Sequence, residues 1–314
     1  MARMKAKAPA PYRPVPKVIT LTDFSDRVDA IGDIHGCVDE AVKLMETMGH
    51  SARFPDDPNL PAEVTVAPGR ALVFLGDLTD RGPRSRDALR LLEGALATGA
   101  GFAIMGNHDS KLMRALGGQQ VQIANGLQGT LDELAVVDPT TRMRWADMLH
   151  AMPHQIKAPA PTPHSADGWV TFAHGAAPEH HQDKENANSV SRALYGYADG
   201  AVDSQGHLIR DDWAAVYSGK RMVVHGHTPV GRVVARNRVV CVDTGAVFGG
   251  SLSALRVDTG EIVQVASSFK FKERANVTRP TMDDAGTVTT HKLEAESVQT
   301  FVAAKSPKTD EIEH

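Results

Sequence analysis

Short, mostly apolar runs alternate with amphipathic stretches over the first hundred residues of the chain. Residues 28–31, 71–75 and 102–105 have the length and composition of buried strands. Between them, residues 38–48 and 85–98 place apolar side chains at helical spacing. The order strand, helix, strand, helix, strand predicts adjacent parallel strands joined by right-handed crossovers. This part of the chain is therefore expected to form an α/β fold.

Helical patterns dominate the middle of the chain. Apolar residues recur at helical spacing in the stretches 112–116, 127–137 and 143–152. The segment 117–131 begins with residues of mixed composition, which suit a cap beside a site better than a core. We therefore expect a helical cap segment here.

Short runs of β-forming residues dominate the second half. Most are bounded by glycine, asparagine or aspartate, which favour turns. The last two runs are separated by Asp258, Thr259 and Gly260 and predict a hairpin. The proline-containing segments 54–69 and 158–167 are predicted to be surface loops. The predicted strands of this half are residues 169–173, 222–225, 239–242, 252–257 and 262–266.

The two ends of the chain differ in composition from the part between them. Residues 1–17 hold basic residues and prolines but no acid, and they lack the apolar core of a signal peptide. Past Ser268 the density of apolar residues falls and charges of both signs mix. We therefore expect a disordered basic arm over residues 1–17, one folded domain over residues 18–269 and a mobile tail over residues 270–314.

Composition narrows the classes of protein. The 314 residues are 42% hydrophobic, which is enough for a sizeable core. The formal net charge of −4 does not mark a nucleic-acid or membrane binder, and no run of about 18 apolar residues predicts a membrane span. The two cysteines, Cys37 and Cys241, predict no disulfide framework and are expected to be packing residues. A reducing, cytoplasmic location is therefore expected.

Metal-binding residue types directly follow five of the predicted strands. Glycine lets the backbone turn sharply and approach a bound group, and open α/β sheets bind ligands at the carboxyl ends of their strands. One core does not need five such turns, so together they indicate a functional site. The turns are Gly32-Asp33-Ile34-His35-Gly36, Gly76-Asp77-Leu78-Thr79-Asp80-Arg81-Gly82, Gly106-Asn107-His108-Asp109, Ala173-His174-Gly175 and His225-Gly226-His227-Thr228.

Six side chains in these turns suit divalent metal ions. Carboxylates, imidazoles and an amide oxygen favour Mn²⁺, with Fe²⁺, Zn²⁺ or Ni²⁺ as alternatives, whereas an all-oxygen Ca²⁺ site would not use this many histidines. Six ligands exceed one tetrahedral shell, so we expect two ions that share a carboxylate, with Asp77 as the bridging ligand. Two-metal sites of this kind hydrolyse phosphate esters. The candidate ligands are Asp33, His35, Asp77, Asn107, His174 and His227.

Three further side chains in the same turns are candidate catalytic residues. The guanidinium of Arg81 could hold a phosphate group by two hydrogen bonds. His108 follows the candidate ligand Asn107 and could protonate the leaving oxygen. Asp80 could fix the tautomer of that imidazole.

The first three turns resemble a known signature. Residues 32–36, 76–82 and 106–109 are similar to the motifs of calcineurin-like metallophosphoesterases, in the branch that holds serine/threonine protein phosphatases and diadenosine tetraphosphate hydrolases. The resemblance implies an α/β fold arranged as a four-layer α/β/β/α sandwich with a helical cap segment, and a metal-dependent phosphatase. It assigns one metal ion to Asp33, His35 and Asp77, and the other to Asp77, Asn107, His174 and His227.

Motifs in the second half narrow this resemblance. They are similar to those of the phosphatase module of bacterial polynucleotide kinase-phosphatases and of stand-alone diadenosine tetraphosphate hydrolases, over about residues 28–267. The likeness implies substrate-binding roles for Arg81, Asn107 and Asp243, and a small phosphate ester as substrate: a nucleotide, a dinucleoside polyphosphate or a nucleic-acid end. A serine/threonine protein phosphatase remains the alternative, because it shares every metal residue. The motifs are residues 107–112, 127–131, 193–196, 212–213, 226–230 and 243–250.

Some positions depart from the family pattern. No Gly-x-x-x-x-Gly-Lys-Ser/Thr sequence occurs, so no P-loop kinase domain is expected on this chain. Thr79 replaces an aliphatic residue, which should matter little, and His225 is expected to point away from the site.

Trp145 and Trp213 are expected to pack against helices. The histidines expected to be solvated in polar loops are His154, His164, His180, His181 and His207.

Overall fold

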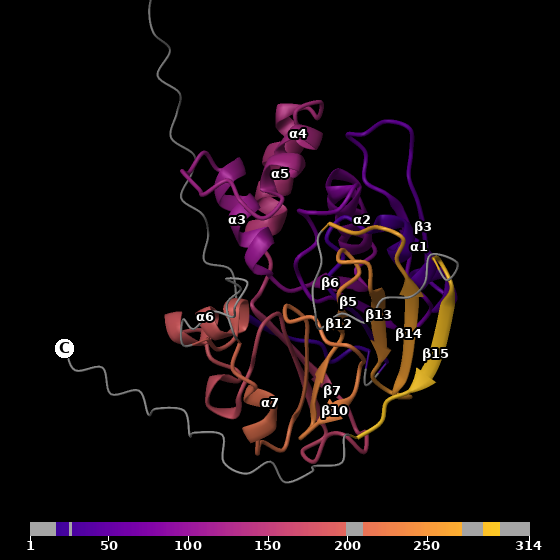
Figure 1. Ribbon diagram of the computed structural model, residues 1–314, viewed down its shortest axis with the longest axis vertical. Coiled ribbons are helices and arrows are strands. Elements are labelled where there is room, and N and C mark those ends of the chain that lie inside the picture. The colour runs from indigo at the N-terminus through magenta and orange to yellow at the C-terminus, as the bar shows by residue number, and fades with distance from the viewer. Residues whose placement is uncertain (1–16, 25–26, 199–209, 272–284, 296–314) are drawn as a thin grey trace, which may run out of the picture.

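Two β-sheets form the centre of the molecule, with helices outside them (Figure 1). The computed structural model describes residues 17–24, 27–198, 210–271 and 285–295. All of the predicted basic arm except Lys17 lies outside the described residues, as does His207.

The larger sheet carries the predicted parallel strands on one side, with β6 last in its order. Its order is β15-β14-β13-β2-β5-β6, with β12 paired to β13. Strands β2, β5 and β6 run parallel, whereas β13 is antiparallel to β2 and forms the predicted hairpin with β14. The bounds are β2 Val28–Ile31, β5 Ala71–Phe74, β6 Gly101–Ala103, β12 Asp243–Thr244, β13 Ser251–Arg256, β14 Glu261–Ala266 and β15 Val288–Lys292.

The second sheet is built mainly from the later part of the chain. Its order is β1-β7-β8-β9-β11-β10, with parallel pairing between β8 and β9 and between β9 and β11. The bounds are β1 Val18–Thr20, β7 Gln155–Pro159, β8 Trp169–Ala173, β9 Met222–His225, β10 Ala235–Arg236 and β11 Val239–Cys241. A separate hairpin joins β3 Ser51–Arg53 and β4 Glu63–Thr65.

The helices predicted from apolar spacing are confirmed. Figure 1 shows α3, α4 and α5 gathered together and apart from α6 and α7. The bounds are α1 Val38–Thr47, α2 Ser85–Ala97, α3 Asn107–Leu116, α4 Leu127–Leu134, α5 Pro139–His150, α6 Ala187–Tyr195 and α7 Trp213–Val216, with a short 3₁₀ turn, η1, at Glu179–His181.

Alternation along the central strands separates two hydrophobic layers. On β5, Ala71 and Val73 pack with residues of the second sheet such as Phe172, whereas Leu72 and Phe74 pack with helices α1 and α2. Side chains of successive strand residues point to opposite faces of a sheet, so a continuous apolar run is buried on both faces. On the far side of the second sheet, a smaller cluster includes residues of β8, β9 and α6. The layers are therefore helix, sheet, sheet, helix, as expected.

Three local predictions are wrong in part, and residues 272–284 and 296–314 of the predicted tail lie outside the described residues. The predicted loop 54–69 contains β4, and the predicted tail contains β15, whose exposed polar residues pair along the edge of β14. The Pro-rich segment from 158 begins inside β7. An edge strand with one open face can be polar, so its composition resembles that of a tail.

The prediction of solvated histidines is also wrong at two positions. His154 and His181 are buried, and the ring nitrogen Nδ1 of His181 contacts the hydroxyl of Ser189 at 3.0 Å. His154 adjoins the pairing of β1 with β7, since its backbone N–H donates to the carbonyl of Lys17. His154 therefore lies at the junction of two distant strands, and His181 lies against α6. His180 is exposed and His164 partly so, and Trp145 packs in the core among the helices.

A buried ion network lies on β2. Asp29 is fully buried and accepts two hydrogen bonds of 2.7 Å from Arg70 and one of 2.9 Å from His50. Removal of one partner leaves buried charges without compensation. Asp29→Ala should therefore lower the free energy of unfolding by about 3–5 kcal/mol, measured by urea denaturation followed by circular dichroism. Glu63→Ala, which breaks an exposed pair with Arg53, should cost less than about 1 kcal/mol; equal losses would contradict the prediction.

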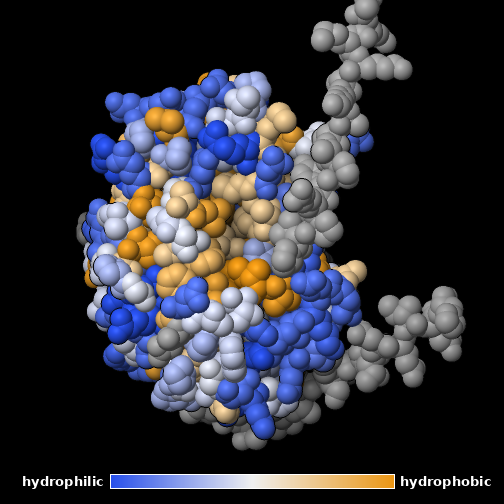
Figure 2. Space-filling view, turned by 180° about the vertical axis from the view of Figure 1, so that it is seen from behind, coloured by the Kyte–Doolittle hydropathy of each residue, from blue (hydrophilic) through white to orange (hydrophobic). Residues whose placement is uncertain are grey.

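The surface is mostly polar. Figure 2 shows polar residues over the top and bottom of one face, with apolar residues gathered across its middle. In the described part of the chain, no helix is long and apolar enough to cross a bilayer.

Candidate metal centre

The five predicted turns meet where strands of both sheets end. Within the larger sheet, the N–H of His35 donates to the carbonyl of Asp77 at 2.9 Å, which joins the turns after β2 and β5. Within the second sheet, the N–H of Gly226 donates to the carbonyl of His174, also at 2.9 Å. The sheets are linked because the N–H of His227 donates to both carboxylate oxygens of Asp33, at 3.1 and 3.0 Å. Residues far apart in the sequence thus form one site.

Backbone conformation in these turns is unusual. Five non-glycine residues have positive φ, a region that side chains rarely adopt. Such conformations persist only where surrounding structure enforces them, and they concentrate at functional sites. The residues, with their φ angles, are His35 at 45°, Asp77 at 49°, Asp80 at 73°, Arg81 at 71° and His227 at 69°.

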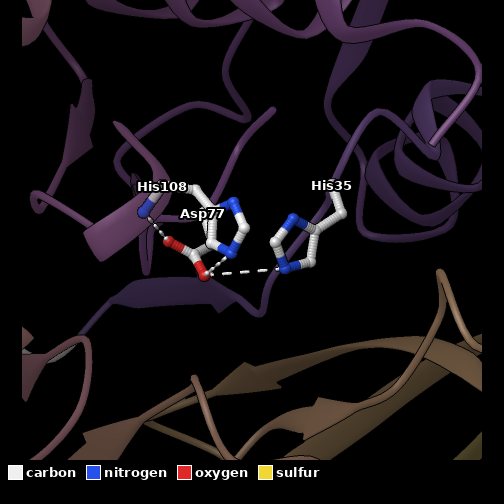
Figure 3. A group of neighbouring side chains, drawn as sticks. All are labelled: His35, Asp77 and His108. Carbon is white, nitrogen blue, oxygen red and sulfur yellow. Dashed lines mark hydrogen bonds and ion pairs between the residues drawn. The ribbon is translucent and has the colours of Figure 1, made fainter. Parts of the chain in front are cut away.

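Asp77 lies at the centre of the site. Its Oδ2 is 3.5 Å from Nε2 of His35 and 4.0 Å from Nε2 of His108, and Figure 3 shows both rings directed at the carboxylate. Its Oδ1 is 3.3 Å from Nε2 of His174. The two oxygens therefore face two different groups of imidazoles, as a bridging ligand requires.

Two groups of potential ligands share this carboxylate. One is His35, Asp77 and His108, and the other is Asp77, His174 and His227; within each group the ligand atoms lie within 4.8 Å of one another. Asn107 joins the second group, since its Oδ1 is 3.1 Å from Nε2 of His174. The first group differs from the expected set, because it contains His108 where the family likeness placed Asp33.

An unsatisfied nitrogen supports the presence of a cation. Nε2 of His227 is buried and has no hydrogen-bond partner among the described residues, while its Nδ1 lies 3.0 Å from Nε2 of His174. Buried polar atoms are normally paired, so a histidine of this group with an unpaired ring nitrogen has capacity left for a ligand. The donor set of nitrogen and oxygen atoms fits Mn²⁺, Fe²⁺ or Zn²⁺.

The carbonyl partners of the histidines set their tautomers. A carbonyl oxygen only accepts, so Nδ1 of His35 must donate to Thr79 at 2.8 Å, and Nδ1 of His174 to Leu75 at 2.8 Å. In each neutral ring the lone pair is then on Nε2, which faces Asp77. Hydrogen bonds of this kind orient metal-ligating histidines.

Charge crowding shifts the pKa values of the central groups. Burial alone would raise the pKa of Asp77, but His174 and His108 hold it well below its usual value. Burial disfavours a charged His174, yet Asp77 and Asp33 raise its pKa to about 10. Burial and the charge of Asp243 raise the pKa of Asp33 well above its usual value. The carboxylates thus attract positive charge, which a divalent cation would supply in place of the proton on His174.

Arg81 lies between two imidazoles of the site. Its two terminal nitrogens donate to Nε2 of His35 at 2.6 Å and to Nε2 of His108 at 2.7 Å. Burial and the charge of Arg81 lower the pKa of His35 well below its usual value. The guanidinium therefore projects two donors into the site, as expected for a phosphate clamp.

His108 is held by the carboxylate predicted for this purpose. Its Nδ1 lies 2.6 Å from Oδ2 of Asp80, and both side chains are buried. The turn that carries His108 also requires glycine at position 106, because a Cβ atom there would collide with the backbone and carboxylate of Asp77.

Two residues named from the sequence remain: Asp243, predicted to bind substrate, and His225, predicted to point away from the site. Asp243 is close enough for its charge to raise the pKa of Asp33, and its Oδ1 accepts the N–H of Gly245 at 2.9 Å. His225 lies in the outward direction: Nδ1 contacts the carbonyl of Gly226, and the ring centre is 5.4 Å from that of Trp213.

Sequence reasoning missed one carboxylate. Asp109 is fully buried and accepts the N–H groups of Asp77, Leu78 and Gly106 at 2.7, 3.0 and 3.0 Å. It ties the turn after β5 to the start of α3. Burial and the charge of Asp77 raise its pKa to about 7. The only signal was its place at the end of the third motif.

Comparison with known proteins assigns the family. Residues 26–240 match the model of the calcineurin-like phosphoesterases. The chain belongs to this family. It is therefore a hydrolase of phosphoric esters, and its candidate ligands agree with the divalent-metal dependence of the family.

Relatives of this phosphoesterase match it over most of their length. The bis(5'-nucleosyl)-tetraphosphatase PrpE (asymmetrical) of Bacillus subtilis is 36% identical over 245 residues, which cover 78% of this chain and 96% of the relative. The protein of the same description from Halalkalibacterium halodurans is 35% identical, with 76% and 93% covered. A crystal structure provisionally described as a diadenosine tetraphosphatase has a TM-score of 0.54 at 25% identity, covering 80% of this chain and 98% of that one.

Proposed function

We propose that this phosphoesterase hydrolyses nucleotides, with dinucleoside tetraphosphates as its preferred substrates. The site observation that carries the proposal is Asp77, whose two oxygens face separate groups of imidazoles. The substrate class is supported by the relatives, which align over more than nine-tenths of their length. The net charge of −4 disfavours long nucleic acids, which need a basic track.

The metal sites are proposed to use the residues named from the sequence. Asp77, Asn107, His174 and His227 would hold one ion, and Asp33, His35 and Asp77 the other, with Mn²⁺ as the metal. When bound, the ions would polarise the phosphoryl oxygens and lower the pKa of the attacking water.

Arg81 and His108 are proposed to handle the phosphate and the leaving group. A phosphate bound beside Arg81 would accept the two N–H groups that now reach His35 and His108. His108 would carry a second proton on Nε2 and give it to the leaving oxygen. Asp80, at 2.6 Å from Nδ1, would stabilise the imidazolium during that step. Asn107 and Asp243 would complete the substrate site.

The two cysteines support a proposal about the cellular compartment of the enzyme. Cys37 and Cys241 are both free thiols, and burial raises the pKa of each above its usual value. Unpaired cysteines suit a reducing compartment, so we propose that the enzyme acts in the cytoplasm.

A substrate panel tests this function. We expect Mn²⁺-loaded enzyme to convert diadenosine tetraphosphate to ATP and AMP with a kcat/KM at least about tenfold above that for 2'- or 3'-nucleoside monophosphates, a 2',3'-cyclic nucleotide or a phosphoserine peptide, a preference that amounts to about 1.4 kcal/mol. Chromatography of the products measures it. Excess chelator should abolish turnover and Mn²⁺ should restore it. If only the phosphopeptide is hydrolysed, the protein is a protein phosphatase and the substrate proposal is wrong.

A further inference from the structure

Helix α4 contacts the turn that carries the catalytic candidates. The hydroxyl of Thr130 donates to Oδ1 of Asp80 at 2.6 Å and accepts the N–H of Asp80 at 3.1 Å. Thr130 is 1% exposed and Asp80 is fully buried, so water does not compete for these contacts. The pair spans fifty positions of sequence.

The contact continues to the imidazole that faces Asp77. Oδ1 of Asp80 meets Thr130, while Oδ2 meets Nδ1 of His108, also at 2.6 Å. Among the residues that the structure describes, these two are the side-chain donors to this carboxylate. The hydroxyl of Thr130 therefore contacts the oxygen of Asp80 that His108 does not use, and the carboxylate is held from both sides.

A second contact holds α4 in place. The carboxylate of Glu133, one turn along the same helix, accepts the N–H groups of Ser85 and Arg86 at the start of α2, at 3.1 and 2.9 Å. These N–H groups have no partner within their own helix, and a carboxylate there is favourable. Gly126, just before α4, is packed so closely on Arg81 that a Cβ atom would collide with the Arg81 backbone. The helix is therefore a rigid support for both Asp80 and Arg81.

We propose that Thr130 is a positioning residue: its hydroxyl orients Asp80 so that Nε2 of His108 is aimed at the leaving oxygen. This inference rests on the proposed role of His108 as the general acid. Charge-assisted hydrogen bonds in a buried site are strong and directional, so their loss changes geometry more than it changes overall packing. A hydroxyl that only filled space would affect all substrates alike.

Two substitutions separate orientation from packing. Thr130→Val keeps the shape but removes the hydroxyl, and Thr130→Ser keeps the hydroxyl but removes a methyl group. With phenyl phosphate, whose leaving group needs a proton, we expect Thr130→Val to lower kcat about 10- to 100-fold, a fraction of the full effect of a general acid. With 4-nitrophenyl phosphate, whose leaving group needs little help, the loss should stay under about threefold. Thr130→Ser should restore most of the activity, and KM should change little.

Controls keep the test decisive. Thr162 is buried and its hydroxyl has no hydrogen-bond partner in the part of the chain that the structure describes, so Thr162→Val should leave both activities unchanged. If Thr130→Val does not fold, as judged by circular dichroism, Thr130→Ala takes its place in the same comparison. Equal losses on both esters, or no rescue by serine, would overturn the proposal. If His108→Ala itself shows no dependence on the leaving group, the acid assignment fails first and takes this inference with it, whereas failure of Thr130 alone leaves the acid assignment standing.

Discussion

Replacement of Asp77 by alanine is expected to remove both metal ions and to lower kcat at least about 10³-fold, equivalent to about 4 kcal/mol of transition-state stabilisation. Asp77 is 2% exposed, and its two oxygens lie 3.5 Å from Nε2 of His35 and 3.3 Å from Nε2 of His174. Among the described residues, Asp77 is the side chain that belongs to both candidate ligand groups. Loss of this one carboxylate should therefore weaken both sites together.

The measurement is metal content by elemental analysis, alongside turnover. Asp77→Asn provides a closer variant, because it keeps the size of the side chain and tolerates the positive φ of this position while lacking the charge. Arg81→Ala is the matched control: it should keep two metal ions per chain and raise KM for phosphate esters, since Arg81 is a cationic donor to the imidazoles of His35 and His108 and cannot itself be a metal ligand. Two metal ions per chain in Asp77→Ala would show that Asp77 is not the bridging ligand.

The second large effect is expected for His108→Ala. A general acid contributes about 10²- to 10⁴-fold to the rate when the leaving group is poor. The buried contact of 2.6 Å between Nδ1 and Asp80 holds the ring with Nε2 toward the site, which is the arrangement that such a proton donor needs. We therefore expect kcat for phenyl phosphate to fall about 10²-fold or more, with a much smaller loss for 4-nitrophenyl phosphate.

Kinetics on the two esters separates the acid role from a metal-binding role. His108 is also one of the two imidazoles that face Oδ2 of Asp77, so its ring nitrogen could serve as a ligand instead. If His108 is the acid, His108→Ala keeps both metal ions and discriminates between the esters. If it is a ligand, metal content falls and both esters lose activity in equal proportion, which would refute the acid assignment.

The sequence by itself determined the central strands and the turns that follow them. The runs 28–31 and 71–75 are apolar because their strands are covered on both faces, by helices and by the second sheet. Glycine directly after such a run indicates a sharp turn of the backbone. Aspartate and histidine in the same turn indicate metal-ligand chemistry. These signals depend on neighbours within a few residues, so they can be found without a structure.

The tertiary structure decided how those turns support one another. The backbone N–H of His227 reaches Asp33 across 194 positions, Asp109 accepts the N–H of Asp77 across 32, and Thr130 reaches Asp80 across 50. The periodicity of the sequence does not indicate which distant backbone group a carboxylate will contact, because that contact depends on how the two sheets and α4 pack. For the same reason the sequence predicts a tail where the polar strand β15 lies, since the position of this strand is set by hydrogen bonds to the edge of β14 and not by its own apolar content.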